Sequence, residues 1–313
     1  MVLAGGARPN LVREAAALRN GRGESGFFGN MVETINGFQV LRKVAESNTA
    51  EIFHVLRLVG RGRGAEAALK VLRPEFAGDR VERNHLENEY RICSTLEHPN
   101  LIRVYEAQMS AKQPFLVMDL ITGVSLKTHL DRGRPDLAEA VDWMAQVADG
   151  LAYFHELGLV HRDVKPQNCV ISQEGTAVLI DFALAMAQEV SLWKYLMRRL
   201  TERRRPGTWS YMSPEQIRNG RVTGTADIYG LGVSLFEVAT GRVPYAAETP
   251  QELLEKHVSA KIPSVLDLRP EVPAELDELI KSMLAKDPLD RPAGMGYVSG
   301  RLRSMIGVCR NIQ

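Results

Sequence analysis

The feature that most restricts the fold of this chain is a short polar loop between two apolar runs. The segment LVHRDVKPQNCVI, residues 159–171, places a histidine, an arginine, an aspartate, a lysine and an asparagine within eight residues. A loop of this length cannot bury all of these groups, and it cannot hold them far apart. The segment therefore indicates a chemical site, with strands on either side that hold the loop in place.

A second acidic group follows at the end of the next apolar run, in the tetrapeptide LIDF, residues 179–182. Asn168 and Asp181 could share a hard divalent cation through their oxygen atoms. Asp163 is a third oxygen donor, and it could take a proton from a hydroxyl group. Each residue alone is equally well explained as a cap or turn residue. The complete string favours the site.

The string HRDVKPQN followed by DF resembles the catalytic loop and magnesium motif of the eukaryotic-type (Hanks-type) serine/threonine protein kinases. The other motifs of that family are ordered and spaced, so the rest of the chain tests the resemblance. Its landmarks occur in the family's order: AALK ending at Lys70, Glu89 nine residues before His98-Pro99-Asn100, Gly207-Thr208, Ser213-Pro214-Glu215, DIYGLG at 227–232 and Arg291 in DPLDRP. The resemblance covers about residues 38–306.

The resemblance implies an α+β fold with two lobes, a small antiparallel β-sheet lobe and a larger, mainly helical lobe. We expect an N-terminal extension at 1–36, which we interpret as mobile, a kinase domain at 37–306 and a C-terminal tail at 307–313. The N-lobe should span about 37–121 and the C-lobe about 122–306. The G-x-G-x-x-G at 21–26 has no strand before it and no helix after it, so we interpret it as a loop.

The local pattern agrees with these two lobes. Residues typical of strands gather at 38–43, 52–59, 65–72, 101–105 and 115–120. Helices are expected at 81–96, 137–157, 226–240, 249–258 and 274–285. Within 137–157, apolar residues recur at steps of three and four, which predicts one buried face.

The family's cofactors are ATP and Mg²⁺, and the resemblance assigns residues to each. Lys70 would hold the α and β phosphates and would be oriented by Glu89. Asn168 and Asp181 would hold Mg²⁺.

The resemblance also assigns the catalytic groups. Asp163 would orient the substrate hydroxyl and accept its proton, while Lys165 would neutralise the γ phosphate. A lysine at that position resembles the serine/threonine branch of the family. Thr208 would reach the same two groups. Asp227 would hold the backbone of the catalytic loop, and Glu215 and Arg291 would form a buried pair.

The adenine ring would lie between the lobes. In the register set by Lys70 and Asp181, the roof would be Val44, Ile52 and Ala68. The floor would be Val170, and Met118 would stand at the back. Asp119 and Ile121 would present backbone groups at the hinge. Taken alone, an apolar residue at any of these positions is simply core.

The first departure from the family is the loop that covers the phosphates, where G-x-G-x-x-G-x-V is expected. Ala45, Ser47 and Ala50 replace the three glycines. Glycine lets the backbone approach a phosphate closely and permits positive φ. Glu46 and Glu51 also add negative charge near a polyanion. We therefore expect weaker nucleotide affinity.

The second departure is Asp181-Phe182-Ala183 in place of D-F-G. The metal ligand is retained. If the backbone at Ala183 needs a positive φ, alanine costs about 1 kcal/mol there.

The segment between Asp181 and Glu215 is unusually basic, with Lys194, Arg198, Arg199, Arg203, Arg204 and Arg205. It could be a solvated loop, a docking surface for an acidic partner, or a store of charge that awaits a phosphate. Thr201 is the candidate phosphorylation site, and Arg162 is the residue that would bind its phosphate.

Three functions remain open from the sequence. The first is a serine/threonine protein kinase that transfers the γ phosphate of ATP to protein hydroxyl groups. The second is a pseudokinase that binds a nucleotide or partners as a scaffold. The third is a small-molecule phosphotransferase, which the GTWSYMSPE segment disfavours because it resembles the peptide-positioning element of protein kinases.

Composition excludes several other classes. The chain has 39 basic and 38 acidic residues, a formal charge of +1, which offers no global field for nucleic acid or an anionic membrane. No apolar run reaches the roughly 18 residues of a spanning helix, and the first residues lack the apolar core of a signal peptide. Three scattered cysteines do not make a disulfide framework or a zinc site. We expect a cytoplasmic protein with protein substrates, without nucleic-acid or membrane partners.

Overall fold

A computed structural model of the 313-residue chain describes residues 33–60, 62–187 and 208–311. The chain divides into two units, Met1–Glu33 and Thr34–Gln313. The second unit contains both of the lobes described below. The predicted N-terminal extension lies almost entirely outside the described residues.

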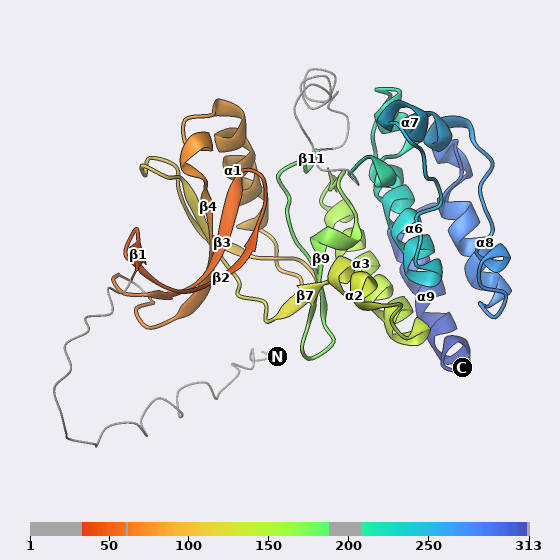
Figure 1. Ribbon diagram of the computed structural model, residues 1–313, viewed down its shortest axis with the longest axis horizontal. Helices are drawn as coiled ribbons and strands as arrows, with labels where there is room; N and C mark the ends of the chain where they lie inside the picture. The colour runs from red at the N-terminus through yellow and green to blue at the C-terminus, as the bar shows by residue number, and fades with distance from the viewer. Residues whose placement is uncertain (1–32, 61, 188–207, 312–313) are drawn as a thin grey trace, which may run out of the picture. The chain divides into compact units, whose positions relative to one another are not determined.

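The N-lobe is a six-stranded antiparallel sheet with one helix (Figure 1). The strand order is β1-β2-β3-β4-β6-β5. The helix α1 (Arg80–Cys93) begins after Asp79, whose carboxylate accepts hydrogen bonds from the N–H groups of Val81 and Glu82. The strands are β1 (Thr34–Ile35), β2 (Phe38–Glu46), β3 (Ala50–Arg57), β4 (Glu66–Leu72), β5 (Val104–Gln108) and β6 (Phe115–Met118).

The C-lobe is mainly helical (Figure 1). Its helices are α2 (Leu126–Arg132), α3 (Leu137–Glu156), α5 (Pro214–Ile217), α6 (Gly224–Thr240), α7 (Pro250–Ser259), α8 (Ala274–Met283) and α9 (Met295–Cys309). Two small sheets carry the site: β7 (Gly123–Ser125), β9 (Cys169–Ser172) and β10 (Ala177–Leu179) form one, and β8 (Leu159–Val160) pairs with β11 (Met186–Ala187). These lobes confirm the predicted α+β class.

Within the described residues, short 3₁₀ helices occupy five connections: η1 (Pro74–Phe76), η2 (Pro166–Asn168), η3 (Thr208–Tyr211), η4 (Val265–Asp267) and η5 (Pro288–Asp290).

The strands differ in their bounds from the prediction, and the largest difference is at 101–105. The segment 101–105 was expected to be a strand, but β5 begins only at Val104. Leu101 and Ile102 are buried, and they meet the end of β10, where the N–H of Ile102 donates to the carbonyl of Leu179 at 3.0 Å. Apolar side chains are therefore needed here to pack the connection against the C-lobe.

The first strand and the last helix extend beyond residues 37 and 306. The sheet begins at β1, three residues before position 37, because Asn36 and Gly37 form a tight turn with φ of 50° and 87° that returns the chain onto β2. At the other end, α9 runs to Cys309, beyond 306, and Cys309 is fully buried.

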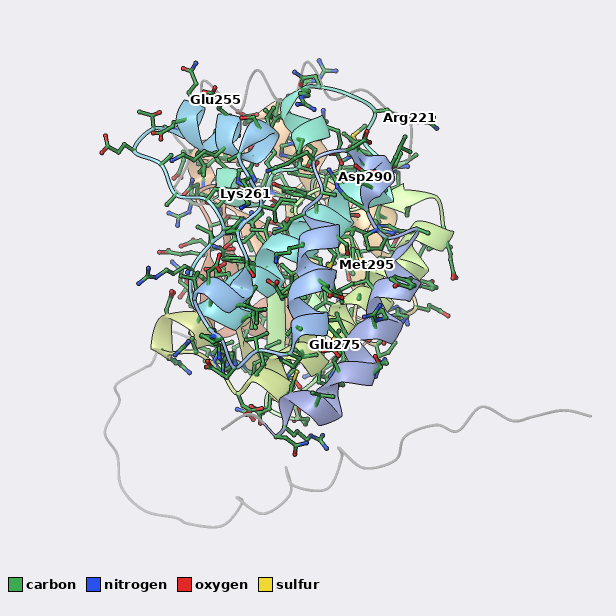
Figure 2. All side chains as sticks on the ribbon, turned by 90° about the vertical axis from the view of Figure 1, so that its right-hand side faces the viewer. Arg221, Glu255, Lys261, Glu275, Asp290 and Met295 are labelled. Carbon is green, nitrogen blue, oxygen red and sulfur yellow. The ribbon has the colours of Figure 1, made fainter. Side chains whose placement is uncertain are left out.

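The outer face of the C-lobe carries exposed charged side chains. Figure 2 looks onto this end of the molecule, where Glu255, Lys261 and Glu275 are exposed on and beside α7 and α8. Met295, which opens α9, is 2% exposed and points into the lobe. Within the described ranges, no helix combines the length and the apolar character needed to cross a membrane.

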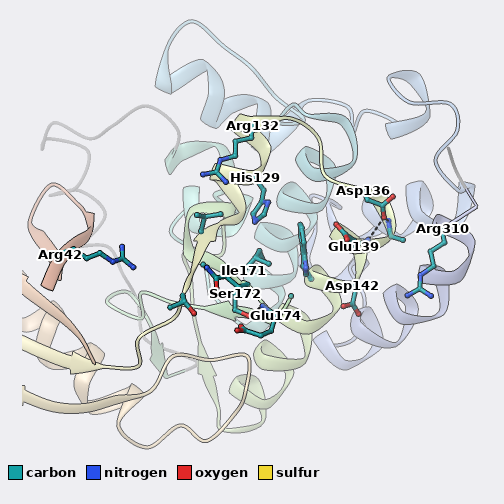
Figure 3. Close-up of a pocket in the computed structure, with 17 residues that line it drawn as sticks. Arg42, His129, Arg132, Asp136, Glu139, Asp142, Ile171, Ser172, Glu174 and Arg310 are labelled. Atoms are coloured by element: carbon teal, nitrogen blue, oxygen red, sulfur yellow. Dashed lines mark hydrogen bonds between the residues drawn. The ribbon is translucent and has the colours of Figure 1, made fainter. Parts of the chain in front are cut away.

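A cavity of about 940 Å³ lies beside the turn between β9 and β10 (Figure 3). Acidic and basic side chains of α2, of α3 and of the connection between them line it, among them Arg132, Asp136 and Glu139. Ser172 closes the turn, because its hydroxyl accepts hydrogen bonds from the N–H groups of Glu174 and Thr176, each at 3.2 Å. None of the residues predicted to bind ATP, metal or substrate lines this cavity.

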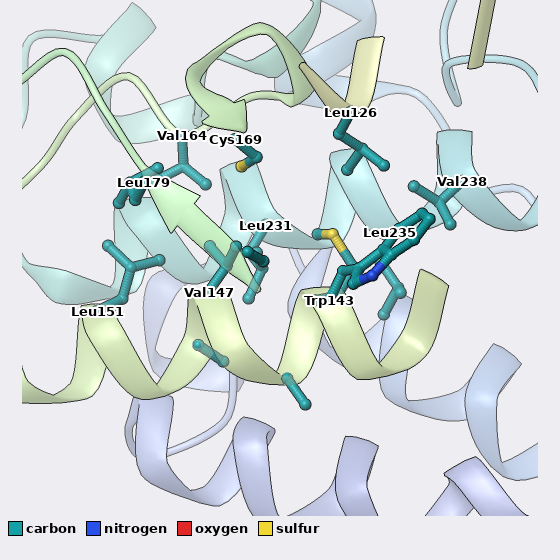
Figure 4. Close-up of a cluster of buried hydrophobic side chains, with 14 of the residues drawn as sticks. Leu126, Trp143, Val147, Leu151, Val164, Cys169, Leu179, Leu231, Leu235 and Val238 are labelled. Carbon is teal, nitrogen blue, oxygen red and sulfur yellow. The ribbon is translucent and has the colours of Figure 1, made fainter. Parts of the chain in front are cut away.

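The C-lobe core lies directly beneath the polar loop (Figure 4). Val164 and Cys169 come from the loop itself and are 3% and 0% exposed. They belong to the same buried cluster as Val147 of α3 and Leu231 of α6. The periodic face of α3 is buried as predicted, with these residues at most 2% exposed: Leu137, Ala140, Val141, Met144, Val147, Ala148, Leu151 and Phe154. The loop is thus anchored by apolar burial.

The stability of the C-lobe should depend on pH through His257. This residue is fully buried on α7, with Nδ1 2.8 Å from the hydroxyl of Tyr229. Burial, aided by the nearby ammonium of Lys286, lowers the pKa of His257 from 6.5 to about 3. The unfolded chain therefore binds a proton that the folded chain excludes, so stability is present above pH 6.5 and is lost as the pH falls toward 3. The titration of His257 should change the free energy of unfolding by at most about 1.4 kcal/mol per pH unit.

Urea unfolding at pH 7 and pH 5 measures this dependence. The variant His257→Phe with Tyr229→Phe removes both partners of the hydrogen bond, so no buried polar atom is stranded. We expect a smaller loss of unfolding free energy between the two pH values in this variant than in the wild type. Equal losses would contradict the assignment to His257.

Candidate active site

Three charged side chains from separate elements meet at one point. Lys70 on β4 has its Nζ 2.6 Å from Oε2 of Glu89 on α1 and 3.5 Å from Oδ1 of Asp181, which follows β10. Burial would lower the pKa of Lys70, but the carboxylates of Asp181 and Glu89 outweigh this effect and raise the pKa above its ordinary value. The ammonium is therefore kept charged, and it joins the N-lobe to the C-lobe.

Asp181 reaches Lys70 because its backbone is in the left-handed region, with φ of 67°. This conformation directs the carboxylate toward Lys70. The next residue, Phe182, is fully buried. The ring of Phe182 packs edge to face against His161 and Phe154, with centroids 4.6 and 5.2 Å apart. Aromatic packing therefore holds the metal-ligand candidate in place.

The substitution of Ala183 for glycine causes no backbone strain here. Its φ is not positive, so the cost that was expected under that condition does not arise. Asn88, the residue before Glu89, donates from Nδ2 to the carbonyls of Ala185 at 2.8 Å and Ala183 at 3.4 Å. The sequence contained no signal for this role of Asn88.

The polar loop brings its own three functional groups together. Nζ of Lys165 lies 2.7 Å from Oδ2 of Asp163. Nδ2 of Asn168 donates to the carbonyl oxygen of Asp163 at 2.8 Å and to its Oδ2 at 3.1 Å. The amide nitrogen is thus turned toward Asp163, which leaves the amide oxygen of Asn168 as the group for a cation.

Asp227 on α6 holds the backbone of this loop through hydrogen bonds. Its carboxylate accepts hydrogen bonds from the backbone N–H groups of His161 at 2.8 Å and Arg162 at 2.7 Å, and the predicted contact is therefore present. Arg162 has a φ of 70°, so these two bonds hold a strained turn. His155 of α3 adds a third contact at 2.8 Å that sequence reasoning missed. Burial opposes ionisation of Asp227, but His155 and the backbone donors keep its pKa below the ordinary value.

A buried ion pair holds α5 in place, the short helix that contains Glu215. Arg291 binds Glu215 through two hydrogen bonds of 2.7 and 2.8 Å, and its side chain is fully buried. Gln216, the next residue, donates to the carbonyl of Arg162 at 3.0 Å. The predicted pair is thus present, and it ties this segment to the catalytic loop.

The residues predicted to surround adenine lie on neighbouring strands. Ile52 pairs with Lys70 across β3 and β4, and Ala68 pairs with Met118 across β4 and β6. Ile121 is partly buried against the hydrophobic core cluster that contains Ala68 and Met118. Val44 is 37% exposed on β2, and Val170 is half-buried on β9. The N–H of Asp119 donates to the carbonyl of Arg103 at 3.1 Å. Their adenine-binding roles remain predictions.

The glycine-free hairpin between β2 and β3 forms, with register shifts between Val40 and Arg42 and between Lys43 and Ala45. Ala45 pairs with Ile52, and Glu46 pairs with Glu51. Both glutamates contact Lys43, and Glu46 also lies 3.0 Å from Arg73. The negative charge that was expected to repel a nucleotide is therefore offset by neighbouring cations.

Part of the predicted regulatory set cannot be placed. Thr201 and the six basic residues around it lie outside the described residues. Thr208 begins η3, and its role remains a prediction.

The donor set suits ATP and Mg²⁺. Asp181, 40% exposed, and Asn168 offer two oxygen ligands, which is how Mg²⁺ is commonly held when phosphates and water complete its shell. Among the described residues there is no group of three or more His, Cys, Asp or Glu side chains that could hold a metal by itself. A Mg²⁺ ion held by these two residues would need further oxygen ligands from phosphate or water.

Comparison with known proteins agrees with this geometry. The protein kinase domain family matches residues 40–299. The chain therefore belongs to the protein kinase domain family, whose members use ATP and Mg²⁺.

Several curated relatives are bacterial enzymes of the Hanks type. The chain is 31% identical over 255 residues to the serine/threonine-protein kinase PrkC of Bacillus subtilis, covering 81% of this chain and 38% of PrkC. It is 35% identical over 257 residues to PknH of Mycobacterium bovis, covering 78% and 42%. It is 33% identical over 261 residues to PknL of Mycobacterium tuberculosis, covering 82% and 62%. The chain thus spans less than two thirds of the length of these relatives.

Among solved structures, the kinase domain of Mycobacterium tuberculosis PknI is similar, with a TM-score of 0.65 and 26% identity. The similarity covers 87% of this chain and 98% of that domain. It supports the two-lobed fold.

Proposed function

We propose that this chain is a serine/threonine protein kinase that transfers the γ phosphate of ATP to hydroxyl groups of proteins. The observation that carries the proposal is the contact of Lys70 with both Glu89 and Asp181, beside the group formed by Asp163, Lys165 and Asn168. Phosphoryl transfer depends on positioning and charge neutralisation, and it needs these groups together. The names of the relatives support the same activity.

Each group has a defined task in this reaction. Lys70 binds phosphate oxygens, and Glu89 orients its ammonium. Asn168 and Asp181 would hold Mg²⁺, which would supply charge neutralisation at the phosphates. Asp163 orients the substrate hydroxyl and accepts its proton, and Lys165, 2.7 Å from that carboxylate, is placed to neutralise the transferred phosphoryl group.

A pseudokinase scaffold is the alternative that the sequence left open. It rested on the missing glycines and on Ala183. Ala183 adopts an unstrained backbone, and the hairpin forms without glycine, so both departures are compatible with a functional site. A scaffold also has no need for a complete set of catalytic side chains.

The test is transfer of label from γ-labelled ATP, in the presence of Mg²⁺, to a generic basic protein acceptor. We expect phosphoserine or phosphothreonine in the acid hydrolysate, and no label with Lys70→Met. Lys261→Met, which changes an exposed lysine of the C-lobe outside the site, is the matched control and should retain most of the activity. Nucleotide binding without transfer would support the scaffold.

The basic segment is proposed as a regulatory element, although it lies outside the described residues. A phosphate on Thr201 would add roughly −1.5 to −2 charges among the neighbouring arginines. We expect autophosphorylation at Thr201 and a loss of about tenfold in activity in Thr201→Ala, because the phosphate would form charge-assisted hydrogen bonds with the neighbouring arginines. Mass spectrometry and initial rates measure these outcomes. Full activity without phosphate at Thr201 would favour an acidic docking partner.

Protein acceptors and a cytoplasmic location are further parts of the proposal. Fractionation of cells that express the native protein tests the location.

A further inference from the structure

The turn that joins β2 to β3 is closed by the side chain of Ser47. Its hydroxyl oxygen accepts hydrogen bonds from the N–H groups of Ala50 at 3.0 Å and Thr49 at 3.4 Å. The N–H of Ser47 in turn donates to the carbonyl of Ala50 at 2.8 Å. Three of the backbone N–H groups at the tip of the hairpin are thus used within the turn.

The same tip is attached to the end of β4. The N–H of Arg73 donates to the carbonyl of Thr49 at 2.9 Å, and the guanidinium of Arg73 lies 3.0 Å from the carboxylate of Glu46. Arg73 is only three residues beyond Lys70, the candidate phosphate ligand. The closed turn therefore lies beside the C-terminal end of the strand that carries Lys70.

Backbone N–H groups in such a turn bind phosphate oxygens well when they are free to point at the ligand. Here the N–H groups of Thr49 and Ala50 already have an acceptor. A phosphate can use them only after the hydroxyl of Ser47 has released them. Since hydrogen bonds to a charged acceptor are stronger than neutral ones, the exchange is feasible, but the lost turn bonds reduce the gain.

We infer that Ser47 is a specificity-determining residue that competes with the phosphates of the nucleotide for the N–H groups of Thr49 and Ala50. The inference rests on the proposed function, because it deepens the account of the same nucleotide site. Its consequence is that the loop contributes little to phosphate affinity, which depends chiefly on Lys70 and the metal. The phosphates of ADP therefore raise its affinity above that of adenosine by less than they would if the two N–H groups were free.

The variant Ser47→Ala removes the hydroxyl and retains Cβ, so it frees the two N–H groups without adding the backbone freedom of glycine. Dissociation constants for adenosine, ADP and ATP with Mg²⁺ are measured on the full chain by competition against a fluorescent nucleotide. We expect ADP and ATP to bind roughly threefold to tenfold more tightly, with adenosine unchanged. Ser47→Thr keeps the hydroxyl and should retain the wild-type constants.

Ser172→Ala is the matched control, because the Ser172 hydroxyl likewise accepts hydrogen bonds from two backbone N–H groups of a turn, and Ser172 is not one of the predicted nucleotide residues. It should change none of the three constants. Circular dichroism checks that each variant is folded, and Ser47→Gly provides a second variant that also lacks the hydroxyl.

Unchanged or weaker binding of ADP and ATP in Ser47→Ala would overturn the inference, as would equal tightening of adenosine. Tighter ADP and ATP binding in a chain that transfers no phosphate would support the inference and count against the proposed kinase activity. A wild-type chain that binds none of the three nucleotides would overturn both.

Discussion

Replacing Asp163 with asparagine should lower kcat for phosphoryl transfer by about 10²–10⁴, the range that a positioned proton acceptor supplies. The asparagine side chain has nearly the same shape, so the contact between Asn168 and the backbone carbonyl at position 163 should survive. The amide cannot accept the proton of the substrate hydroxyl, and it cannot pair electrostatically with Lys165. The Michaelis constant for ATP should change little, because Asp163 is not assigned to the nucleotide.

Initial rates with labelled ATP and a protein acceptor measure both constants. Asp131→Asn makes the same chemical change on an exposed residue of α2 and should leave the rate within about twofold of the wild type. A kcat for Asp163→Asn within threefold of the wild type would show that the catalytic role is wrongly assigned.

Replacing Arg291 with methionine should destabilise the fold by about 3–5 kcal/mol, because it leaves the carboxylate of Glu215 buried without its cation. Glu215 is 7% exposed, and it receives two hydrogen bonds from the guanidinium. Arg291 also donates to the backbone carbonyls of Thr225 and Ala285, which the methionine would leave unsatisfied. The loss is therefore expected to be among the largest for a single side chain.

Unfolding in urea, followed by circular dichroism, measures the effect. The double variant Arg291→Met with Glu215→Leu should recover part of the loss, since it removes both buried charges. Arg303→Met breaks the ion pair with Asp149, which is partly exposed, and should cost less than about 1 kcal/mol. If Arg291→Met were as mild as Arg303→Met, the buried pair would not have the proposed structural importance.

Much of the site was predictable because kinase motifs carry their order and spacing in the chain. Lys70, Glu89 and Asp181 were expected to meet, although they are separated by up to 111 residues. The same holds for Glu215 and Arg291, and for Asp227 beneath the catalytic loop. In each case the catalytic role or the buried contact requires a particular type of side chain, so the residue can be recognised in the sequence.

Other features depend on backbone conformation and were not predictable. The cost at Ala183 was expected only if its φ were positive, but the left-handed residue is Asp181. Glu46 and Glu51 were expected to repel a polyanion, whereas Lys43 and Arg73 lie beside them. Strand register and loop path decide such contacts, and neither leaves a periodic signal in the residues themselves.

The sequence by itself therefore determined the two-lobed class, the buried face of α3 and the set of polar residues that form the site. These follow from side-chain type and spacing, which are local properties of the chain. Only the tertiary structure decided that His155 supports Asp227, that Asn88 joins α1 to the segment after Asp181, and that Ser47 closes its turn. Tertiary packing decides these contacts, because a polar side chain can form a hydrogen bond with any suitable group that the fold brings within about 3 Å.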